Sequence, residues 1–445
     1  MRILRFSAVC VAAAFALTAC SSGTAETPQA STGTPEPATI KLWLNGTDTP
    51  AELRDYLTTT FAAKNPGSTL VIEEQDWSGL VPRLQTALAS KDQTPDVVEI
   101  GNTQSPTFTY AGAFADITDM KSELGGDKLL EGFVSAGSVG DKFFAAPYYS
   151  GARAVFYNKD LFAAAKVTVP TTLTEFATVA KALQAAPPAG ATNFSGFWFP
   201  GQDWYNGAAW IYSAGGELAV KDGDTWAGAL STSKSIAGLE QVQDLFEHAT
   251  SAPKDADSNE PWVPFNNGQA AMFSAPTWAR WSIDLPQCNK GVAADDKSDA
   301  AKALLAEQQA CNEEHTGVFA LLGATGDVAP VFAGGSNIAV AANSKHPELA
   351  KNLLRIIFSA EYQKMLGSKG LIPANTDYVS SLGDDVYSKA AIAAAVAAKL
   401  TPPAVKWADV EGDRILEDFF QKIAAGADVK ETAAATDKLI SSTLN

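Results

Sequence analysis

The sequence contains few of the residues from which metal sites and catalytic centres are built. Among its 445 residues there are 3 His and 4 Cys, and the His residues are scattered without the spacing of a metal-ligand set. Neither an HExxH sequence nor a Gly-x-Ser-x-Gly elbow is present. Lys and Arg are also scarce, 33 against 50 Asp and Glu, and a net charge of −17 argues against a nucleic-acid partner, whose phosphates require cations. We therefore expect no metal, no cofactor and no nucleic acid.

Long apolar runs are lacking after the N-terminus, and the one at the N-terminus is short. Arg2 and Arg5 precede the apolar residues 6–17, fewer than the roughly 20 residues that span a bilayer. Leu17-Thr18-Ala19-Cys20 then resembles the lipobox of a bacterial lipoprotein signal. This resemblance implies a signal peptide over residues 1–19 and a lipid on Cys20, acylated as in other lipoproteins, that anchors the protein to the outer face of the cell membrane. An ordinary secretory peptide with an incidental cysteine is the alternative.

A tether is expected between the anchor and the folded body. Residues 21–38 read SSGTAETPQASTGTPEPA and contain no large apolar side chain. Such a segment buries too little surface to offset the entropy lost on ordering, so residues 20–38 are expected to be disordered. The first residues that look folded are Thr39 to Leu44.

Only two cysteines remain for the mature body, because Cys10 leaves with the signal peptide and Cys20 carries the lipid. Cys288 and Cys311 are therefore predicted to form a disulfide, which outside the cytoplasm is the simplest state of a leftover pair. The bond would hold the charged, Ala-rich residues 289–310. Two separate buried thiols are the alternative.

Hydrophobic periodicity predicts alternating strands and helices. The first part reads as strand 40–44, a helix marked by Leu53, Leu57 and Phe61, strand 70–72, a helix at 80–88 and strand 96–100. Thr49-Pro50-Ala51-Glu52 and Thr172-Leu173-Thr174-Glu175 have the capping-box spacing. Further elements are predicted at strand 155–158 and at helices near 176–183, 236–246, 349–356 and 388–400. The fold class is therefore α/β, with mostly parallel sheets.

The body is too long for one core, so two lobes are expected. We assign residues 39–149 and 265–332 to the first lobe and residues 150–264 and 333–445 to the second. Candidate hinges lie near residues 149–151, Pro264 and residues 332–334.

Four segments together carry a family resemblance. They resemble landmarks of family 1 extracellular solute-binding proteins, in that family's order and spacing, over the body from Thr39 to the C-terminus. The segments are DVVEIGN at 96–102, YNKDLF at 157–162, FNNGQAAM at 265–272 and GGSNIAV at 334–340. The resemblance implies a two-lobed fold of the maltose-binding-protein type that closes on its ligand by hinge motion. It also implies a receptor of an ATP-driven importer, which hands a sugar to a membrane permease. Residues 74–79 and 87–104 look most similar to actinobacterial receptors for chitobiose and N-acetylglucosamine.

Aromatic residues are concentrated between positions 194 and 212. Rigid rings stack on the apolar face of a pyranose, while carboxylates and amides bind its hydroxyls. Phe194, Phe197, Trp210 and Tyr212 are interpreted as core. For Trp198 and Trp204, which are flanked by Gly, Pro and Asp, ligand binding and core packing are equally favoured.

Other candidate ligand-binding residues lie where α/β sheets place ligands, just after strand ends. Trp278 is the first choice, because the resemblance implies an aromatic there that stacks on the ligand. For Asn45 and Asn337, a role as turn residues that cap their own backbone explains the residue type nearly as well as ligand contact. For Arg153, a bridge between two acidic residues is the alternative. The remaining candidates are Trp77, Asn102, Gln104, Tyr148, Arg280 and Ser336.

The sequence thus predicts a monomeric, non-enzymatic receptor that captures a sugar, either an oligosaccharide such as chitobiose or N-acetylglucosamine. The alternative is a secreted glycoside hydrolase or polysaccharide lyase, because glycosidases also combine aromatic rings with paired carboxylates. Asp203 or Glu217 would be the candidate acids. A surface adhesin or sensor is disfavoured by the lack of repeats.

Overall fold

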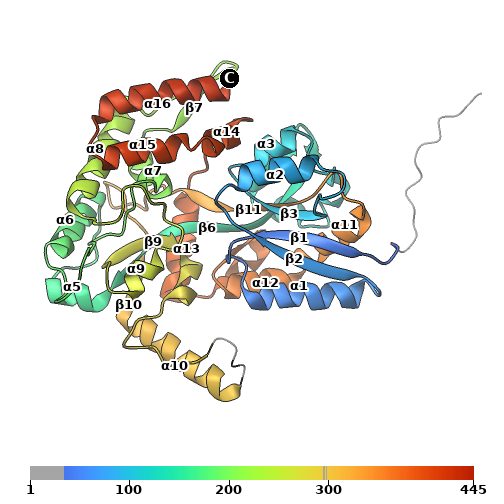
Figure 1. Ribbon diagram of the computed structural model, residues 1–445, viewed down its shortest axis with the longest axis horizontal. Coiled ribbons are helices and arrows are strands. Elements are labelled where there is room, and N and C mark those ends of the chain that lie inside the picture. Colours follow the sequence, from blue (N-terminus) through green and yellow to red (C-terminus); the bar gives the residue numbers. More distant parts are fainter. Residues whose placement is uncertain (1–34, 294–295, 297) are drawn as a thin grey trace, which may run out of the picture. The chain divides into compact units, whose positions relative to one another are not determined.

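The computed structural model describes residues 35–293, 296 and 298–445 (Figure 1). The predicted signal peptide, Cys20 and residues 21–34 of the predicted tether lie outside the described residues. Residues 37–445 form the folded unit. Among the described residues, no helix combines the length and the hydropathy that crossing a membrane requires.

The N-terminal part of the unit has the predicted alternation of strands and helices. Strand β1 (Thr39–Asn45) pairs in parallel with β2 (Thr69–Gln75) and with β3 (Val97–Gly101), all of whose residues are buried. Helix α1 (Ala51–Lys64) buries Leu53, Leu57 and Phe61, and α2 (Leu80–Ala89) buries Leu80, Val81, Leu84, Ala87 and Leu88. Apolar side chains three and four positions apart share one face of a helix, which is why these patterns predicted the helices correctly.

The two predicted capping boxes have different outcomes. Thr172 caps α6 (Leu173–Gln184) and accepts a hydrogen bond of 3.2 Å from the backbone N–H of Glu175, as predicted. The Glu175 carboxylate accepts from the backbone N–H of Thr171 and not from that of Thr172, so the second bond of the box differs from the prediction. The prediction for Thr49 is wrong, because the cap position of α1 is Pro50. The Thr49 hydroxyl lies instead 3.0 Å from the buried hydroxyl of Tyr148. A tertiary partner has therefore replaced the local one.

The central sheet is mixed, because the 14-residue strand β6 (Ala145–Asn158) pairs only antiparallel. Its partners are β9 (Met272–Pro276), β10 (Thr316–Phe319), β11 (Ala333–Val340) and β12 (Ile372–Pro373). Strand β11 also pairs antiparallel with β3 and so connects β6 to the parallel strands. The α/β class is confirmed, but the expectation of a mostly parallel sheet is wrong. The reason is that the chain segments that pair with the long strand β6 run in the direction opposite to it.

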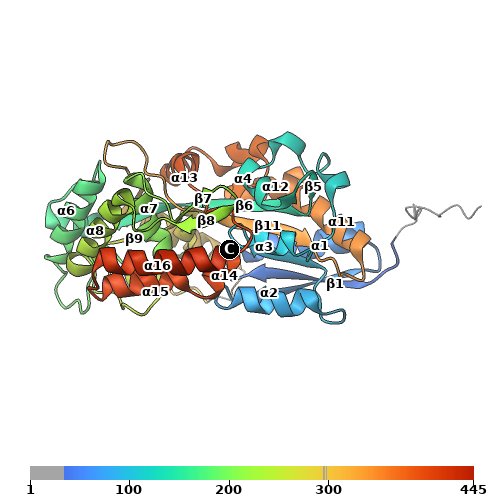
Figure 2. The same ribbon diagram turned by 90° about the horizontal axis from the view of Figure 1, so that it is seen from above.

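Helices cover both ends of this sheet, and two short hairpins complete the unit (Figure 2). The remaining helices are α3 (Ser105–Tyr110), α4 (Glu131–Ala136), α5 (Lys159–Ala165), α7 (Trp204–Ser213), α8 (Ser233–His248), α9 (Trp262–Asn266), α10 (Asp299–His315), α11 (Pro347–Ile357), α12 (Ala360–Ser368), α13 (Val386–Ala397), α14 (Trp407–Gly412), α15 (Ile415–Ala424) and α16 (Val429–Leu444). Short 3-10 helices span Thr118–Met120, Gly126–Lys128, Thr277–Ser282 and Thr376–Leu382. The hairpins pair β4 (Ser138–Val139) with β5 (Lys142–Phe143) and β7 (Ala219–Asp222) with β8 (Thr225–Gly228).

Two large hydrophobic clusters divide the unit into two halves. The cluster of the first half has members between residues 40 and 149 and between 338 and 374. The cluster of the second half has members between 152 and 249, at 271 and 272, between 321 and 332 and between 394 and 444. The assignment expected from the sequence differs from these clusters, because it places residues 265–332 in the first lobe and residues 333–445 in the second. On the basis of this packing we propose that the chain crosses along β6, along β11 and a third time after residue 374.

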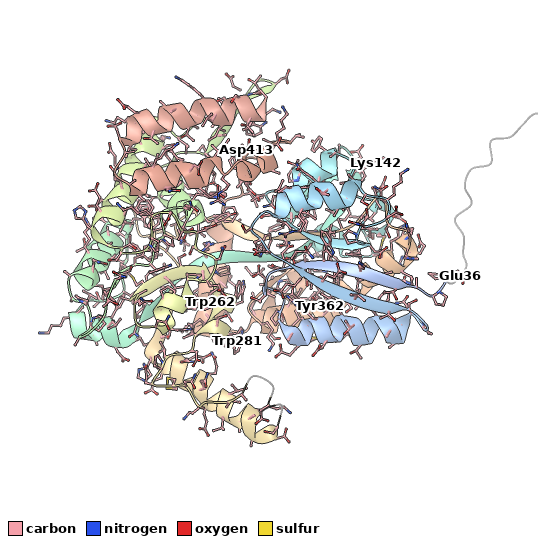
Figure 3. All side chains as sticks on the ribbon, viewed as in Figure 1. Glu36, Lys142, Trp262, Trp281, Tyr362 and Asp413 are labelled. Carbon is pink, nitrogen blue, oxygen red and sulfur yellow. A yellow bond between two sulfur atoms is a disulfide. The ribbon has the colours of Figure 1, made fainter. Side chains whose placement is uncertain are left out.

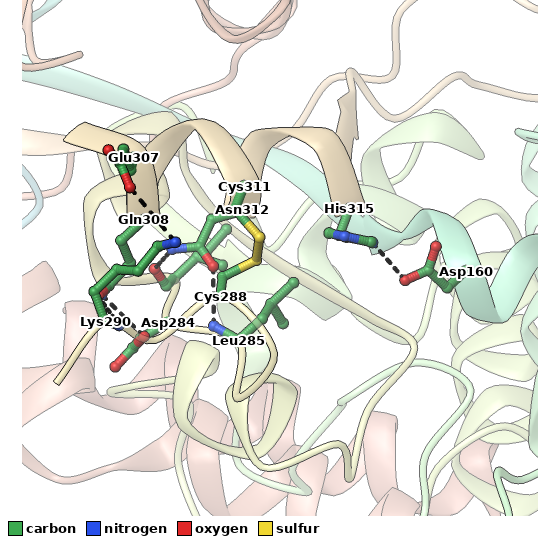
Figure 4. Close-up of a disulfide and its surroundings, with 11 residues drawn as sticks. Asp160, Asp284, Leu285, Cys288, Lys290, Glu307, Gln308, Cys311, Asn312 and His315 are labelled. Atoms are coloured by element: carbon green, nitrogen blue, oxygen red, sulfur yellow. Dashed lines mark hydrogen bonds and ion pairs between the residues drawn. A yellow bond between two sulfur atoms is a disulfide. The ribbon is translucent and has the colours of Figure 1, made fainter. Parts of the chain in front are cut away.

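Cys288 and Cys311 form a disulfide, with Cα atoms 5.5 Å apart, so this prediction is confirmed (Figure 4). The bond fastens α10 to the segment that precedes it. Cys288 is buried, whereas among the residues of α10 only Ala301 and Asn312 are classed as buried. A helix with so little buried surface depends on such links, because most of the stability of a helix in a protein comes from packing of its buried face. The His315 Nδ1 atom also lies 2.7 Å from the Asp160 carboxylate on α5.

Candidate functional site

The two halves meet along β6 and β11, and polar side chains from both halves gather there. Gln104, at the start of α3, donates a hydrogen bond of 2.7 Å from Nε2 to the Glu411 carboxylate on α14. Asn102 donates a bond of 2.9 Å to the carbonyl oxygen of Ala333, the first residue of β11. We call the region around these contacts the junction. Its first wall consists of residues that follow or flank β1, β3 and β6, and its second wall of residues from β6, α7, α14 and α15.

Asp48 and Trp77 form the outer part of the first wall. The Trp77 Nε1 atom lies 3.2 Å from Asp48 Oδ2, and both side chains are half-buried. Gly46 makes this arrangement possible, since it adopts a φ of +50° and a Cβ there would lie 3.2 Å from the Trp77 ring. Only glycine tolerates both the left-handed conformation and the close ring readily. The wall therefore presents an indole beside a carboxyl group.

Glu99 and Tyr149 form the inner part of the first wall. The Tyr149 hydroxyl lies 2.9 Å from Glu99 Oε1 and 3.2 Å from Asp48 Oδ2. The other Glu99 oxygen accepts 2.9 Å from the backbone N–H of Asn45. Glu99 is 0% exposed, and burial disfavours its charged form. Desolvation, strengthened by the nearby Asp48 charge, raises the Glu99 pKa to about 7, and desolvation raises the Asp48 pKa to about 6.

Arg153 and Tyr205 are central to the second wall. The Arg153 guanidinium lies 5.6 Å from the centre of the Tyr205 ring, a cation–π distance, and donates 3.1 Å to the Ser274 carbonyl. Both residues line a small cavity together with Asn206 and Trp210. Asp203, at the start of α7, is fully buried and accepts from the Asn206 backbone. Burial raises the Asp203 pKa, although the Arg153 charge opposes this.

Two glutamates near the ends of α14 and α15 complete the second wall. Glu411 accepts from Gln104 and, over 2.9 Å, from the Trp407 indole N–H. Desolvation raises the pKa of Glu411 and raises that of Glu417 to about 7. Glu417 Oε2 and Gln104 Oε1 are buried acceptors without a hydrogen-bond partner among the described residues. The junction thus offers carboxyls, amides and rings, a set that suits an uncharged ligand rich in hydroxyl and amide groups.

Several predicted residues come together at the junction. Trp77, Asn102, Gln104 and Arg153 have the contacts given above. Asn45 lies directly behind them, fully buried, with Nδ2 donating 3.1 Å to the Glu99 carbonyl. The alternative for Arg153 is a bridge between acidic residues. Its guanidinium donates to the Ser274 carbonyl and lies over the Tyr205 ring, while the Asp203 carboxylate accepts from the Asn206 amide.

Other predicted residues are packed in the interior. Tyr148 is 0% exposed and its hydroxyl lies 2.6 Å from that of Tyr362. Trp204 is 0% exposed inside the second cluster, edge-on to Phe332, so core packing accounts for it. Asn337 is buried in β11 and donates to two backbone carbonyls. Ser336 is also buried in β11, in register with Tyr149 and Gly101.

Trp278, Arg280 and Trp198 lie near the cluster around Phe273, and Trp278 also packs against the cluster of the first half. Trp278 is half-buried and meets Trp262 edge-on, with ring centres 5.5 Å apart. In the view of Figure 3, Trp262 and Trp281 lie on one side of β6 and Asp413, which follows α14, on the other. Arg280 pairs with Asp385 over 3.0 Å, and the half-buried Trp198 packs beside the cluster around Phe273. Contact of these three with a ligand stays a prediction.

Sequence reasoning missed Asp48, Glu99, Tyr149, Tyr205 and Glu411. A signal for Glu99 existed, since it is the one charged residue inside the buried strand Val97–Gly101. A charged group in such a position is rarely found without a partner. Asp48 and Glu411 stand in ordinary polar surroundings in the sequence. Nothing local distinguishes them from the other acidic residues.

One group of metal-ligating residues lies close together in the part of the chain that the structure describes. Cys288, Cys311 and His315 have potential ligand atoms within 4.8 Å of one another. The two sulfurs are bonded to each other in the disulfide. Metal ligation requires thiolates, so this donor set does not fit a metal ion in its oxidised state.

Two α/β halves joined by long strands, with a polar and aromatic junction, define a two-lobed binding-protein fold. Solved structures with this fold include the GacH receptor of Streptomyces glaucescens, studied with acarbose (19% identity, TM-score 0.75, 92% of this chain and 99% of that one). A solute-binding protein of an ABC transporter from Thermotoga lettingae, bound to α-D-tagatose, has a TM-score of 0.74 (18% identity, 92% and 100% covered). The sugar-binding protein MalE of Xanthomonas citri has a TM-score of 0.70 (19% identity, 91% and 97% covered).

The sequence comparisons then define the family. The profile of the bacterial extracellular solute-binding proteins matches residues 45–364, and the protein belongs to this family. It is 33% identical over 380 residues to the diacetylchitobiose binding protein DasA of Streptomyces coelicolor, which covers 84% of this chain and 82% of DasA. A putative binding protein of Brucella abortus is 24% identical over 396 residues, 85% of this chain and 88% of that one. These relatives are binding proteins by name, and the family expectation from the sequence is confirmed.

Proposed function

We propose that the protein is the sugar-binding receptor of an ABC importer and that it captures chitobiose or N-acetylglucosamine at the junction. The observation that carries the proposal is the composition of the junction: an indole and a phenol ring, three amides and several carboxyls with raised pKa values. Acetylated amino sugars have an apolar ring face, hydroxyls and a neutral amide, which match these groups. The 33% identity to DasA supports the acetylated amino sugar in particular.

The two halves close over the ligand in this proposal. Trp77 and Tyr205 cover its faces, while Asp48, Gln104, Arg153 and Glu411 bond its polar rim. Closure along β6 and β11 follows the hinge type of motion, in which a few residues between rigid bodies absorb the change. Trp198 and Trp278 are proposed as further contacts for a longer oligosaccharide.

The carboxyls at the junction are proposed to bind and not to catalyse. In the first wall, Asp48 and Glu99 both lie within hydrogen-bond distance of one hydroxyl, that of Tyr149. A glycosidase instead places its two carboxyls on opposite sides of the scissile bond, several ångströms apart. The hydrolase alternative is tested by incubating the protein with chitooligosaccharides and analysing the mixture by mass spectrometry. Unchanged chitooligosaccharides would support the receptor function. Products shorter than the starting oligosaccharides would exclude a purely binding role.

Delivery requires an anchor and a partner, which we also propose. Cys20 carries the lipid after cleavage, the segment up to residue 38 tethers the body, and a monomer presents its closed form to a membrane permease. Mass spectrometry of the membrane-extracted protein tests the lipid. A mature N-terminus without lipid would contradict it.

Calorimetric titration against a panel of mono- and disaccharides tests the proposed ligand. The panel contains N-acetylglucosamine, diacetylchitobiose, its deacetylated form, cellobiose and maltose. We expect micromolar binding, about −8 kcal/mol, for the acetylated sugars and at least tenfold weaker binding of the others. Small-angle scattering with and without the bound sugar measures closure. Binding of maltose or cellobiose alone would contradict the assignment.

A further inference from the structure

Three side chains of the first wall form a hydrogen-bonded group with one member facing outward. Tyr149 lies between Glu99, at 2.9 Å, and Asp48, at 3.2 Å. Glu99 is 0% and Tyr149 2% exposed, whereas Asp48 is half-buried. Asp48 is therefore the member that a ligand at the junction can reach.

Asp48, Tyr149 and Glu99 have too few protons for both carboxyl groups to be ionised and hydrogen-bonded to the phenol at once. A phenol carries one proton, and an ionised carboxylate only accepts hydrogen bonds. If both carboxyls are ionised, the Tyr149 hydroxyl can donate to one, and the other oxygen faces the phenol oxygen with no proton between them. The Asn45 backbone N–H bonds Glu99 Oε2 and the Trp77 indole N–H bonds Asp48 Oδ2, and neither donor places a proton between the phenol and a carboxyl group. Protonation of Glu99 resolves the conflict, because Glu99 then donates to Tyr149 and Tyr149 donates to Asp48.

We propose that Asp48, Tyr149 and Glu99 share one carboxyl proton near neutral pH and that binding of the sugar is linked to this proton. The inference rests on the proposed function and adds a role for Glu99 as a positioning residue, which acts on Asp48 through Tyr149. Loss of the proton places two negative charges on either side of one buried hydroxyl. Their repulsion displaces Asp48 from the position that Trp77 and Tyr149 fix.

The other groups that face the pair come from α1, β6 and β11. Arg54, held by the carbonyls of residues 46 and 49, and Arg153 favour ionised Asp48. The Ser336 hydroxyl favours ionised Glu99. Desolvation outweighs these effects and leaves the pKa values near 6 and 7. Since the two carboxyls interact, both values belong to the pair, which keeps one proton close to pH 7.

A ligand that covers Asp48 removes its remaining water and so favours the protonated pair. Binding is therefore expected to take up a fraction of a proton near pH 7 and to weaken as the pH rises. We expect the affinity for diacetylchitobiose at pH 8.5 to be about three- to tenfold lower than at pH 6.0, since uptake of one proton corresponds to at most tenfold per pH unit. Calorimetry in phosphate and Tris, which differ in ionisation enthalpy, measures the proton uptake directly.

The variant Glu99→Gln distinguishes the effect of the Glu99 proton from the effect of the side chain's packing. The amide oxygen can accept from Asn45 and the amide nitrogen can donate to Tyr149, so the variant imitates protonated Glu99 at every pH. We expect its affinity to lose most of the pH dependence and its proton uptake to fall. Glu99→Ala should bind weakly at both pH values, because it removes both hydrogen bonds. Glu123→Gln, an exposed glutamate that pairs with Arg355, is the matched control and should behave as wild type.

The outcomes distinguish this inference from the proposed function. Equal wild-type affinity at the two pH values, without proton uptake, would overturn the inference and leave the function intact. If none of the panel sugars binds, the proposed function fails. The shared proton is then tested by the pH dependence of thermal unfolding of the ligand-free protein. A melting temperature that falls between pH 5 and pH 8 in wild type, and less in Glu99→Gln, supports the shared proton. Parallel profiles would overturn it.

Discussion

Gln104, directly before α3, donates a hydrogen bond of 2.7 Å to Glu411 on α14, across 307 positions of sequence. The same carboxylate accepts from Trp407 over 2.9 Å, so its position on α14 is fixed independently of Gln104. Gln104 belongs to the first half and Glu411 to the second. Their bond therefore contributes to holding the halves together.

Gln104→Ala removes this link and should weaken sugar binding about three- to tenfold, because a net hydrogen bond of this kind is worth roughly 0.5–1.5 kcal/mol. Calorimetry measures the loss. Gln241→Ala, on the exposed face of α8, is the control. Unchanged affinity would mean that the contact plays no part in closure.

Trp77→Ala should weaken sugar binding at least tenfold, because in the proposed function its ring stacks on the sugar. The melting temperature of the empty protein should change by no more than about 2 °C, because the side chain is only half-buried. Trp278→Ala should also weaken binding tenfold. Trp226→Ala, a half-buried tryptophan on β8, is the control. A loss confined to the Trp278 variant would place the sugar on the side of β6 where Trp262 lies.

Trp204→Ala should lower the free energy of unfolding by about 3–5 kcal/mol, since it leaves a cavity in a fully buried cluster. Denaturant unfolding followed by circular dichroism measures the change. The affinity of the protein that remains folded should stay close to wild type. A variant that is as stable as wild type but no longer binds sugar would indicate that Trp204 contacts the ligand.

Replacing Cys288 and Cys311 together by Ser should destabilise the protein by about 3 kcal/mol, the loop-closure estimate for this sequence separation. Sugar affinity should not change, because the contacts that α10 makes with Cys288 and Asp160 involve none of the junction residues. Native mass spectrometry before and after reduction confirms the bond. Reduction without any loss of stability would show that α10 holds its place by other contacts.

Burial raises the Glu417 pKa to about 7, above the ordinary value of 4.5. The folded state therefore binds more protons than the unfolded state between about pH 4.5 and 7, and stability from this group falls as the pH rises through that window. Glu417→Gln should raise the melting temperature at pH 8 relative to wild type, and less at pH 5. Asp418→Asn, exposed on the same helix, is the control. An equal shift at both pH values would contradict the assignment.

The sequence determined the elements and the class of protein. The spacing of Leu53, Leu57 and Phe61, and the apolar strand around Val97, are local patterns whose physical cause is burial of one face. Segments such as residues 96–102 and 334–340 carried the family resemblance, and the order of Cys residues led to the disulfide. The helix and strand patterns need only neighbours along the chain.

Only the tertiary structure decided which polar groups meet. Thr49 became a partner of Tyr148 instead of a helix cap, and Trp204 is fully buried in a hydrophobic cluster although its surroundings in sequence suited a ligand contact. Asp48 and Glu99 acquired their raised pKa values through burial, which outweighs the hydrogen bond from Tyr149, a residue 50 or more positions away. Desolvation and hydrogen bonding depend on distances in space, and the return of β11 between β3 and β6 set those distances.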